Sequence, residues 1–322
     1  MKAIQVQQAG GPEVLHFVEV PVPEPKPNEA LVKVSASGVN FIDVYQREGR
    51  YKVPLPFVLG QEGAGVVTAV GSSVESVKPG DRVAWSGILG SYAAYAAVPA
   101  DRLVPIPSAI TEQQAAATML QGMTAHYLTH DTYPLKHGET ALIHAASGGV
   151  GLSLVQMAHN LGARVIGTVS TEEKAKLARD AGADEIILYT NQDFETETRR
   201  LTDNKGVHVV YDGVGKDTFE KGLNVLRTRG YMVLFGGSSG PVPPFDLIQL
   251  STKGSLYVTR PTLGHYIVTT QDLRARAKDV FEMIASGKLK VRIQRTYPLT
   301  DAAEAHRDLQ SRKTTGKLLL IP

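Results

Sequence analysis

Apolar runs of strand length alternate with helical patterns between residues 140 and 237. The runs TALIHAA (140–146), RVIGTVS (164–170) and VHVVYDGVG (207–215) have the composition of buried strands, and helical patterns such as TEEKAKLARDAG stand between them. A chain that returns repeatedly through helices to one sheet forms parallel strands covered by helices on both faces. This segment therefore predicts an α/β fold with a doubly wound parallel sheet.

The flanking segments have a different pattern. Residues 1–110 contain short alternating runs closed by glycine, as in ALVKVSASGV and GAGVVTAVG, which are typical of strands. Residues 111–131 open with Thr111 as an N-cap and have the composition of a helix, and KLLLIP predicts a last strand. We expect a β-rich domain of residues 1–122 plus 265–322, and a parallel-sheet domain of residues 123–264 inserted into it.

Composition excludes several classes of protein. The chain has 322 residues and no cysteine, which rules out disulfides, thiolate zinc sites, iron–sulfur clusters and a cysteine nucleophile. A net charge of +2 is too small to indicate a nucleic-acid partner or an anionic membrane surface. No apolar run approaches the ~18 residues that cross a bilayer, and the first residues lack the apolar core of a secretory signal. We expect a cytoplasmic protein without nucleic-acid or membrane partners.

A glycine-rich loop, ASGGVG at 146–151, follows the strand TALIHAA and opens a helix. Gly148 and Gly149 would let the backbone approach a pyrophosphate, and Gly151 would permit close packing of the helix on the strand. Ala146 stands where the G-x-G-x-x-G pattern has its first glycine. A tight glycine turn between packed elements would have the same sequence, but the surrounding alternation favours a dinucleotide site.

The end of the next strand indicates which dinucleotide is bound. An NAD site usually has Asp or Glu there to accept from the ribose 2′-hydroxyl, whereas this chain has Val169, Ser170 and Thr171. Lys174 follows one turn later and could attract a 2′-phosphate, although it could also be an ordinary solvated lysine of a helix. The pattern predicts NADPH in preference to NADH.

Motifs along the whole chain resemble those of one family. They are GVNFIDVYQREGRY, LGQEGAGVV, VKPGDRVAW, QGMTAHYL, HAASGGVG, GTVSTEEKAKLARDAGAD, VVYDGVG, LFGGSSG and LYVTRP. In this order they are similar to the zinc-independent quinone oxidoreductases, or zeta-crystallin-like group, of the medium-chain dehydrogenase/reductase superfamily. The resemblance implies a Rossmann domain inserted in a GroES-like domain, a cleft between them, and quinone reduction by NADPH in a homodimer. The segment GSLYV would be the strand that pairs between subunits.

The resemblance also implies the residues of the site. Lys174, Tyr189 and Arg312 would meet the adenosine 2′-phosphate with help from Ser170, and Asn40 and Thr124 would lie at the nicotinamide end. Tyr45 and Tyr51 would border the quinone pocket, although either tyrosine could equally be a core residue. The full cofactor set is Asn40, Thr124, Ser147, Gly148, Gly149, Val150, Gly151, Ser170, Lys174, Tyr189, Val214, Phe235, Gly236, Ser238 and Arg312; the catalytic set is Tyr45, Tyr51, Asn40 and Gln61.

Gln61, in the segment VLGQEGAGVV, bears on whether a metal takes part. The metal-dependent relatives have a histidine ligand at this position, and a neutral amide is a poor zinc ligand but a good hydrogen-bonding group. We therefore expect a site without metal, in which Gln61 binds a ligand or is structural. Two alternatives remain open: an NADPH-dependent reductase of activated alkenes such as enones, and a non-enzymatic NADPH-binding protein of the crystallin or RNA-binding kind.

Overall fold

The computed structural model describes all residues from Met1 to Pro322, and they form two compact units. One unit consists of Met1–Met123, Ile267–Gly287 and Val291–Pro322. The other consists of Thr124–Tyr266 and Lys288–Lys290. Neither unit contains a helix that is both long enough and apolar enough to span a membrane.

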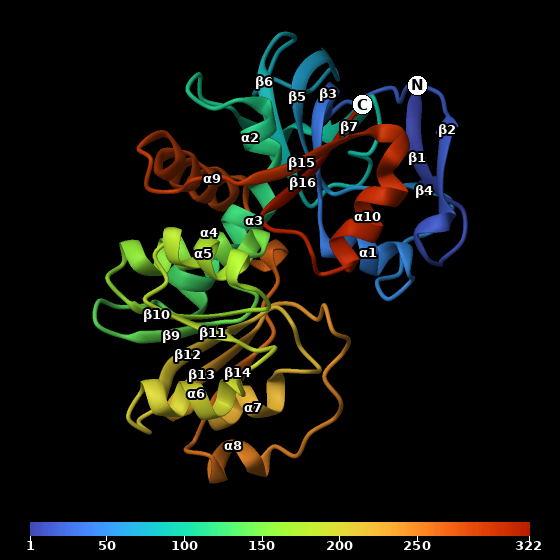
Figure 1. Ribbon diagram of the computed structural model, residues 1–322. Helices are drawn as coiled ribbons and strands as arrows, with labels where there is room; N and C mark the ends of the chain where they lie inside the picture. Colours follow the sequence, from blue (N-terminus) through green and yellow to red (C-terminus); the bar gives the residue numbers. More distant parts are fainter. The chain divides into compact units, whose positions relative to one another are not determined.

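The second unit is the doubly wound domain that the alternating pattern predicts. Its six-stranded sheet is parallel throughout and has the order β11-β10-β9-β12-β13-β14. Helices α4 and α5 cover one face, and α6 and α7 cover the other (Figure 1). The strands are β9 (Thr140–Ile143), β10 (Arg164–Val169), β11 (Glu185–Leu188), β12 (Val207–Asp212), β13 (Leu226–Leu234) and β14 (Tyr257–Thr259), and the helices are α4 (Gly149–Asn160), α5 (Glu172–Asp180), α6 (Phe194–Leu201), α7 (Phe219–Asn224) and α8 (Ile248–Thr252).

The strand order determines where a ligand can bind in this unit. The chain builds the sheet outward from β9 in one direction, through β10 and β11, and then returns to add β12 beside β9. Loops that follow two such neighbouring strands run to opposite faces of the sheet, so a crevice opens at their carboxyl ends. The three strands next to this point are packed together by one cluster of buried apolar side chains. It includes Leu142 of β9, Ile166 of β10 and Val210 of β12.

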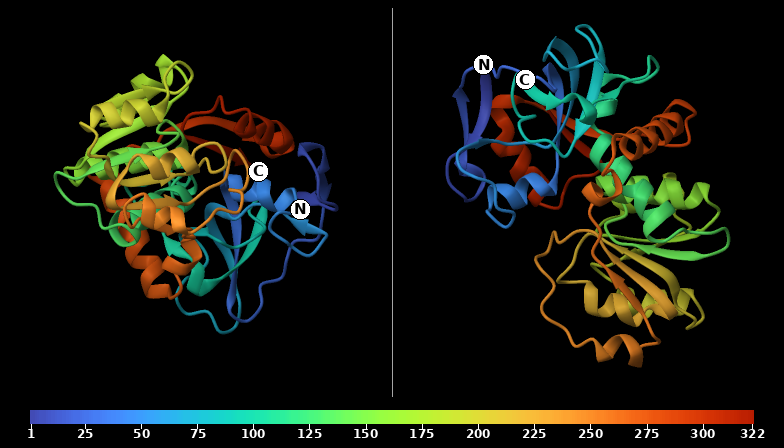
Figure 2. Two further views of the ribbon diagram at one scale, coloured as in Figure 1. Left: turned by 90° about the horizontal axis from the view of Figure 1, so that it is seen from below. Right: turned by 180° about the vertical axis from the view of Figure 1, so that it is seen from behind.

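The first unit is β-rich and contains the end of the chain. Its larger, seven-stranded sheet has the order β15-β16-β3-β5-β6-β8, with β7 also paired to β3, and a smaller sheet has the order β2-β1-β4. The last strand therefore lies between β15 and β3, beside the N-terminal segment (Figures 1 and 2). The strands are β1 (Lys2–Val6), β2 (Leu15–Glu19), β3 (Glu29–Val39), β4 (Phe57–Val58), β5 (Glu62–Val70), β6 (Arg82–Ser86), β7 (Tyr95–Pro99), β8 (Val104–Pro105), β15 (Ile293–Pro298) and β16 (Lys317–Ile321), and the helices are α1 (Phe41–Arg47), α2 (Glu112–Ala116), α9 (Thr270–Ala285) and α10 (Ala302–Gln310).

The segment 111–131 differs from the single helix that its composition predicts. Thr111 does cap α2, and its hydroxyl accepts from Gln114 N at 3.1 Å. The helix stops at Ala116, however, and the chain resumes as α3 (Met119–Tyr127), followed by a π-helical turn, Leu128–Thr132. The interruption leaves the N–H of Leu120 free to donate to the Glu62 carboxylate at 2.6 Å. A contact with a distant strand thus overrides local helix propensity.

Candidate functional site

The glycine-rich loop joins β9 to α4, and its residues form the amino end of that helix. Gly148 is the N-cap, and no side chain makes a capping hydrogen bond there. A Cβ on Gly151 would stand 2.1 Å from the carbonyl oxygen of Ala145, so only glycine permits this close packing. The first N–H groups of a helix have no partner within it and favour anions. Ser147, Gly148, Gly149 and Val150 all belong to this turn or to the first helical turn.

Ala145 is a feature of this loop that the sequence did not reveal. Its φ is +51°, in the left-handed region where a non-glycine residue is strained. Position 145 is therefore alanine although its backbone conformation favours glycine, whereas position 151, which packs against the Ala145 carbonyl, is glycine. No residue type at position 145 signals this conformation, because alanine is ordinary in both strands and helices.

A second loop at the same sheet edge follows β12, and Asp212 holds its shape. The buried Asp212 carboxylate accepts from Val214 N at 2.7 Å, Gly215 N at 3.0 Å and the Thr218 hydroxyl at 2.7 Å. The loop after the adjacent β13 packs directly on this turn, since a Cβ on Gly236 would meet the Gly213 carbonyl oxygen at 2.5 Å. Phe235 N donates to Asp212 O at 2.9 Å, and Ser238 N donates to Gly213 O at 3.2 Å.

Three predicted 2′-phosphate residues lie at the carboxyl ends of β10 and β11. Lys174 Nζ donates to the Ser170 hydroxyl at 3.2 Å, and partial burial lowers the pKa of that lysine. Tyr189 begins the loop after β11 with its backbone N–H bonded to Val169 O at 3.1 Å, and 44% of its surface is exposed. No carboxylate belongs to the turn at Val169–Thr171. Arg312 belongs to the first unit, where it is exposed with a φ of +61°.

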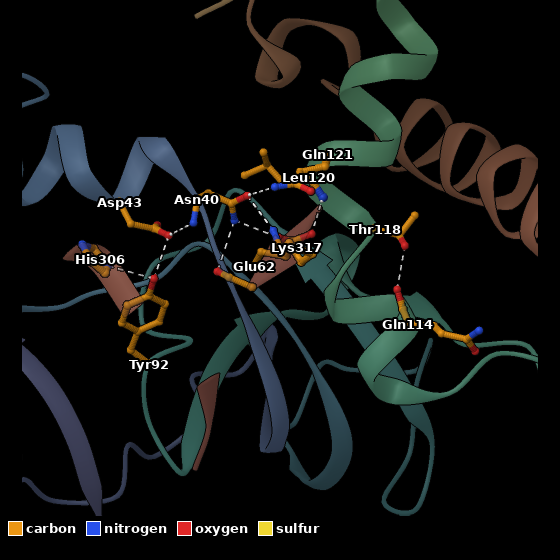
Figure 3. A network of polar contacts seen from close by, with 11 residues as sticks. Asn40, Asp43, Glu62, Tyr92, Gln114, Thr118, Leu120, Gln121, His306 and Lys317 are labelled. Atoms are coloured by element: carbon orange, nitrogen blue, oxygen red, sulfur yellow. Dashed lines mark hydrogen bonds and ion pairs between the residues drawn. The ribbon is translucent and has the colours of Figure 1, made fainter. Parts of the chain in front are cut away.

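The first unit contains a buried network of charged and polar side chains, drawn in Figure 3. Lys317 Nζ lies 2.5 Å from Glu62 Oε2 and 2.7 Å from Asn40 Oδ1. The exposed fractions of the two charged side chains are 1% and 0%. Strand register explains the convergence: Leu318 is opposite Val39 in the β16–β3 pair, so Lys317 comes opposite Asn40. In the β3–β5 pair Ser37 is opposite Gly63, which brings Glu62 to the same end.

The Asn40 side chain has its hydrogen-bonding groups engaged within the chain. Nδ2 donates to Glu62 Oε2 at 2.8 Å and to Gly38 O at 3.2 Å, and Oδ1 accepts from Lys317 and, at 3.4 Å, from Gln121 Nε2. A carboxamide has two N–H donors and two acceptor lone pairs. Its predicted role at the nicotinamide end stays a prediction, and a hydrogen bond from Asn40 to a ligand would have to displace one of these partners.

A second arm of the network joins α1 to α10. Asp43 Oδ2 accepts from Asn40 N at 2.8 Å and from the Tyr92 hydroxyl at 3.0 Å, and that hydroxyl lies 3.2 Å from His306 Nε2 (Figure 3). Arg47 donates to His306 Nδ1 at 3.0 Å. Burial raises the pKa of Asp43 to about 7, against the lowering effect of its hydrogen bonds and of Lys317. Burial, together with the Arg47 charge, lowers the pKa of His306 to about 3.

The predicted substrate residues lie on less buried parts of this unit. Tyr45 and Tyr51 meet edge to face with ring centroids 5.6 Å apart, and 46% of Tyr51 is exposed. The Arg50 guanidinium lies 5.4 Å from the centre of the Tyr45 ring. Tyr51 is therefore not a core residue, and Gln61 is half-buried at the turn before β5. The structure contains no group of three or more His, Cys, Asp or Glu side chains arranged to hold a metal ion.

Sequence reasoning singled out only Asn40 of this buried network and missed Asp43, Arg47, Glu62, Tyr92, His306 and Lys317. Each stands in a segment whose pattern suggests something simpler. Lys317 opens the apolar run KLLLIP, where a lysine is expected to mark the solvated start of a strand. Arg47 and His306 lie on short helices that look like amphipathic surface helices. Their only sequence signal would be a charged residue at a position where the helical periodicity expects an apolar one. A single sequence does not distinguish such a buried charge from a charge at the boundary of the apolar face.

Comparison with known proteins places these features in a family. Two family models match: the alcohol dehydrogenase GroES-like domain at residues 26–108 and the zinc-binding dehydrogenase at residues 149–285. The quinone oxidoreductase of Pseudomonas aeruginosa is 49% identical over 323 residues, covering 100% of this chain and 99% of that protein. The 2-haloacrylate reductase of a Burkholderia species is 40% identical over 331 residues, covering 99% of this chain and 98% of that protein. The structure of the Escherichia coli quinone oxidoreductase complexed with NADPH matches with a TM-score of 0.98 and 47% identity, and each chain covers 100% of the other.

Asp43 and His306, the groups of the second arm that titrate between about pH 3 and pH 7, predict opposing pH dependences of stability. The raised pKa of Asp43 gives stability that is lost as pH rises from about 4 to about 7. The lowered pKa of His306 gives stability that is lost as pH falls from about 6.5 to about 3. In Asp43→Asn only the histidine contribution remains, so its unfolding free energy should rise more steeply with pH between 4.5 and 6.5 than that of the wild type.

Urea unfolding followed by circular dichroism at several pH values measures this difference. The Asn side-chain oxygen can still accept from Asn40 N and Tyr92, so the substitution itself adds a cost that does not vary with pH. Asp101→Asn, at an exposed aspartate, is the matched control and should parallel the wild type. A constant offset between Asp43→Asn and the wild type across the range would contradict the raised pKa.

Proposed function

The chain belongs to the quinone oxidoreductase group of the medium-chain dehydrogenase/reductase family, and on this basis we propose that it reduces quinones with NADPH and without a metal. The observation that carries the cofactor choice is Lys174 paired with Ser170 at a strand end that has no carboxylate. A carboxylate there would accept from the 2′-hydroxyl of NADH and repel a 2′-phosphate. The complete absence of cysteine and the amide of Gln61 support the proposal that no zinc takes part.

The residues of the second unit fit a dinucleotide phosphate. Gly148 and Gly151 allow the backbone of the β9–α4 turn to approach a pyrophosphate, and the amino end of α4 favours its negative charge. Lys174, Ser170 and Tyr189 are proposed to hold the 2′-phosphate, and Val214, Phe235, Gly236 and Ser238 to line the groove. When bound, NADPH supplies the hydride, and the protein's contribution is to orient it and exclude water.

On the substrate side, we propose that Tyr45, Tyr51 and Gln61 border the quinone. Two-electron reduction delivers one hydride to the quinone and requires one proton to complete the hydroquinone. Tyr51 is exposed enough to exchange with water, so a tyrosine hydroxyl or water itself can supply that proton. A quinone accepts hydride without a Lewis acid, which agrees with the lack of thiolate ligands.

Reduction of an activated alkene is a second candidate on the same fold. It is favoured by the 2-haloacrylate reductase, which resembles this chain at 40% identity along nearly its full length. An alkene conjugated to a carbonyl or carboxylate accepts hydride at carbon in the same manner, and a proton then adds to the neighbouring carbon. The two functions differ in the acceptor that supports cofactor oxidation.

Steady-state oxidation of NADPH and NADH with 1,4-benzoquinone, a naphthoquinone and an enone tests the function. We expect turnover of the quinones with NADPH, unchanged after treatment with a chelator. Turnover with the enone alone would replace quinone reduction with alkene reduction. Tight NADPH binding without turnover of any acceptor would contradict both and favour a non-enzymatic role.

Lys174→Ala tests the cofactor choice. The variant loses a charge-assisted contact worth about 1.5–3 kcal/mol, so the dissociation constant of NADPH should rise by roughly one to two orders of magnitude, whereas that of NADH should not change. Fluorescence titration of each nucleotide measures this. Lys176→Ala is the control, because Lys176 lies two residues on in the same helix and its side chain is 75% exposed, paired with Asp180. Equal weakening of NADPH and NADH would contradict a 2′-phosphate contact.

We further propose that the protein is a homodimer formed through the edge of the parallel sheet. The strand β14 is the last of its sheet and has β13 on one side only. Tyr257 of this strand is 49% exposed, and Leu247 and Ile248, at the start of the preceding helix α8, are 70% and 60% exposed. An edge strand in a segment with exposed apolar side chains is a template for pairing with a second copy. The cytoplasmic location expected from the sequence also stays a prediction.

The double variant Leu247→Lys/Ile248→Lys tests the dimer. Both side chains are exposed, so the substitutions should leave the fold intact while repulsion between like charges separates the subunits. Light scattering after size exclusion should report the mass of a dimer for the wild type and of a monomer for the variant. Val268→Lys, at an apolar side chain 68% exposed in the other unit, is the control and should remain dimeric. An unchanged dimer mass in the double variant would exclude this surface.

A further inference from the structure

The buried network of the first unit has one polar side chain that reaches a less buried position. Asn40, Glu62 and Lys317 have exposed fractions of 3%, 0% and 1%, whereas Gln121 at the start of α3 is half-buried. Gln121 Nε2 donates to Asn40 Oδ1 at 3.4 Å, and Figure 3 shows this side chain at the end of the network. The second Nε2 hydrogen and the Oε1 atom make no hydrogen bond within the chain.

The ion pair determines which way the Gln121 carboxamide faces. Glu62 can only accept, so it requires the NH2 group of Asn40, and Lys317 can only donate, so it requires the oxygen of Asn40. The oxygen of Asn40 therefore faces Gln121. Because an amide oxygen only accepts hydrogen bonds, Gln121 must present its NH2 group to it. A buried carboxylate and a buried ammonium thus fix the orientation of two amides in succession.

We propose that Gln121 is a hydrogen-bond donor to the substrate's carbonyl oxygen, and that Glu62 and Lys317 are positioning residues that orient it through Asn40. This inference rests on the proposed function, because the carbonyl belongs to the quinone or enone that is reduced. Gln121 precedes Thr124 by three residues on α3, so the two side chains share a face of that helix. Thr124 is the residue that the resemblance assigns to the nicotinamide end.

The chemistry of the reaction favours a donor of this kind. As hydride arrives, the substrate carbonyl oxygen gains negative charge, and a fixed N–H aimed at it stabilises the transition state more than the ground state. A freely rotating glutamine would lose side-chain entropy on forming the bond. The hydrogen bond from Gln121 Nε2 to Asn40 Oδ1, at 3.4 Å, restricts that freedom before a substrate binds.

The backbone around the ion pair is adapted to hold it. A Cβ on Gly38 would meet Glu62 Oε2 at 2.2 Å and the Lys317 Cε atom at 2.7 Å, so glycine at 38 leaves room for the charged groups. The other Glu62 oxygen accepts from Leu120 N at 2.6 Å, which fixes the backbone one residue before Gln121. Desolvation of a buried ion pair offsets much of its attraction, so the pair contributes geometry more than stability.

Gln121→Leu tests the contact. With the protein saturated in NADP⁺, so that no reaction occurs, calorimetric titration with 1,4-naphthoquinone should show affinity lower by about five- to tenfold, as for loss of one hydrogen bond. The ratio kcat/KM for the same quinone should fall at least as far, and the dissociation constant of NADPH should stay unchanged. Gln113→Leu is the matched control, because Gln113 is exposed on α2. Equal quinone affinity in the two variants would overturn the inference.

A second variant tests the positioning residues. Glu62→Gln/Lys317→Met removes both charges together, so no unpaired charge is left buried, and the variant should fold with a melting temperature near that of the wild type. Its kcat/KM for naphthoquinone should fall as in Gln121→Leu, and the triple variant should show no further loss, because the residues act through one contact. An unchanged kcat/KM, or losses that multiply, would overturn the positioning role.

The calorimetric readout separates failure of this inference from failure of the proposed function. If the wild type binds naphthoquinone but oxidises no NADPH with it, quinone reduction is wrong, and the comparison of Gln121→Leu with Gln113→Leu still decides the contact. If the wild type turns over quinones and the two variants do not differ, the function stands and the role of Gln121 is wrong.

The single variant Lys317→Arg should retain the affinity for naphthoquinone that Glu62→Gln/Lys317→Met loses, because a guanidinium can also donate to Asn40 and Glu62.

Discussion

The ion pair between Glu62 and Lys317 sets the local geometry around which the polar network of the first unit is arranged. Both charges are withdrawn from water, so each requires its partner and the surrounding hydrogen bonds to offset the loss of hydration. Three neighbouring features follow from this requirement. The helix is interrupted before Leu120, whose N–H donates to Glu62; residue 38 is glycine, which leaves room for the charged groups; and the Asn40 amide is oriented with its NH2 group toward Glu62. The last strand of the chain must also lie where it does, because Lys317 is its first residue.

The two units position their proposed binding groups by different means. The second unit relies on the backbone: glycines bring main-chain N–H groups close to one sheet edge, and the buried Asp212 holds the neighbouring turn through N–H donors and a hydroxyl. Such a surface suits phosphates, which need several donors and little chemical discrimination. The first unit relies on side chains whose orientation is set by buried charges, as the proposed contact with a substrate carbonyl oxygen requires.

Much of the fold could be predicted from the sequence. The alternation of strand and helix patterns identified the parallel sheet. The loop at 146–151 does open α4, and Thr111 does begin α2, as the sequence predicts. The helix break at 117–118 and the roles of Lys317 and His306 could not be predicted, because they arise from contacts between residues more than 50 positions apart. A lysine before an apolar run has the same local sequence whether it is solvated or buried against a carboxylate. Local pattern therefore locates elements, whereas buried charge pairs become visible only when register is known.

The placement of β16 also governs the order in which the chain can assemble. The second unit is continuous from Thr124 to Tyr266 apart from Lys288–Lys290, so nearly all of it leaves the ribosome before the C-terminal segment exists. The first unit, although β1 to β8 precede the second unit, lacks β15, α10 and β16 until residues 291–322 have been synthesised. During that interval residues 37–39 of β3 lack the strand that later pairs with them, and Glu62 has no ammonium beside it. The nascent first unit is thus the later of the two to complete its fold, and its exposed strand edge is the segment most open to misassembly.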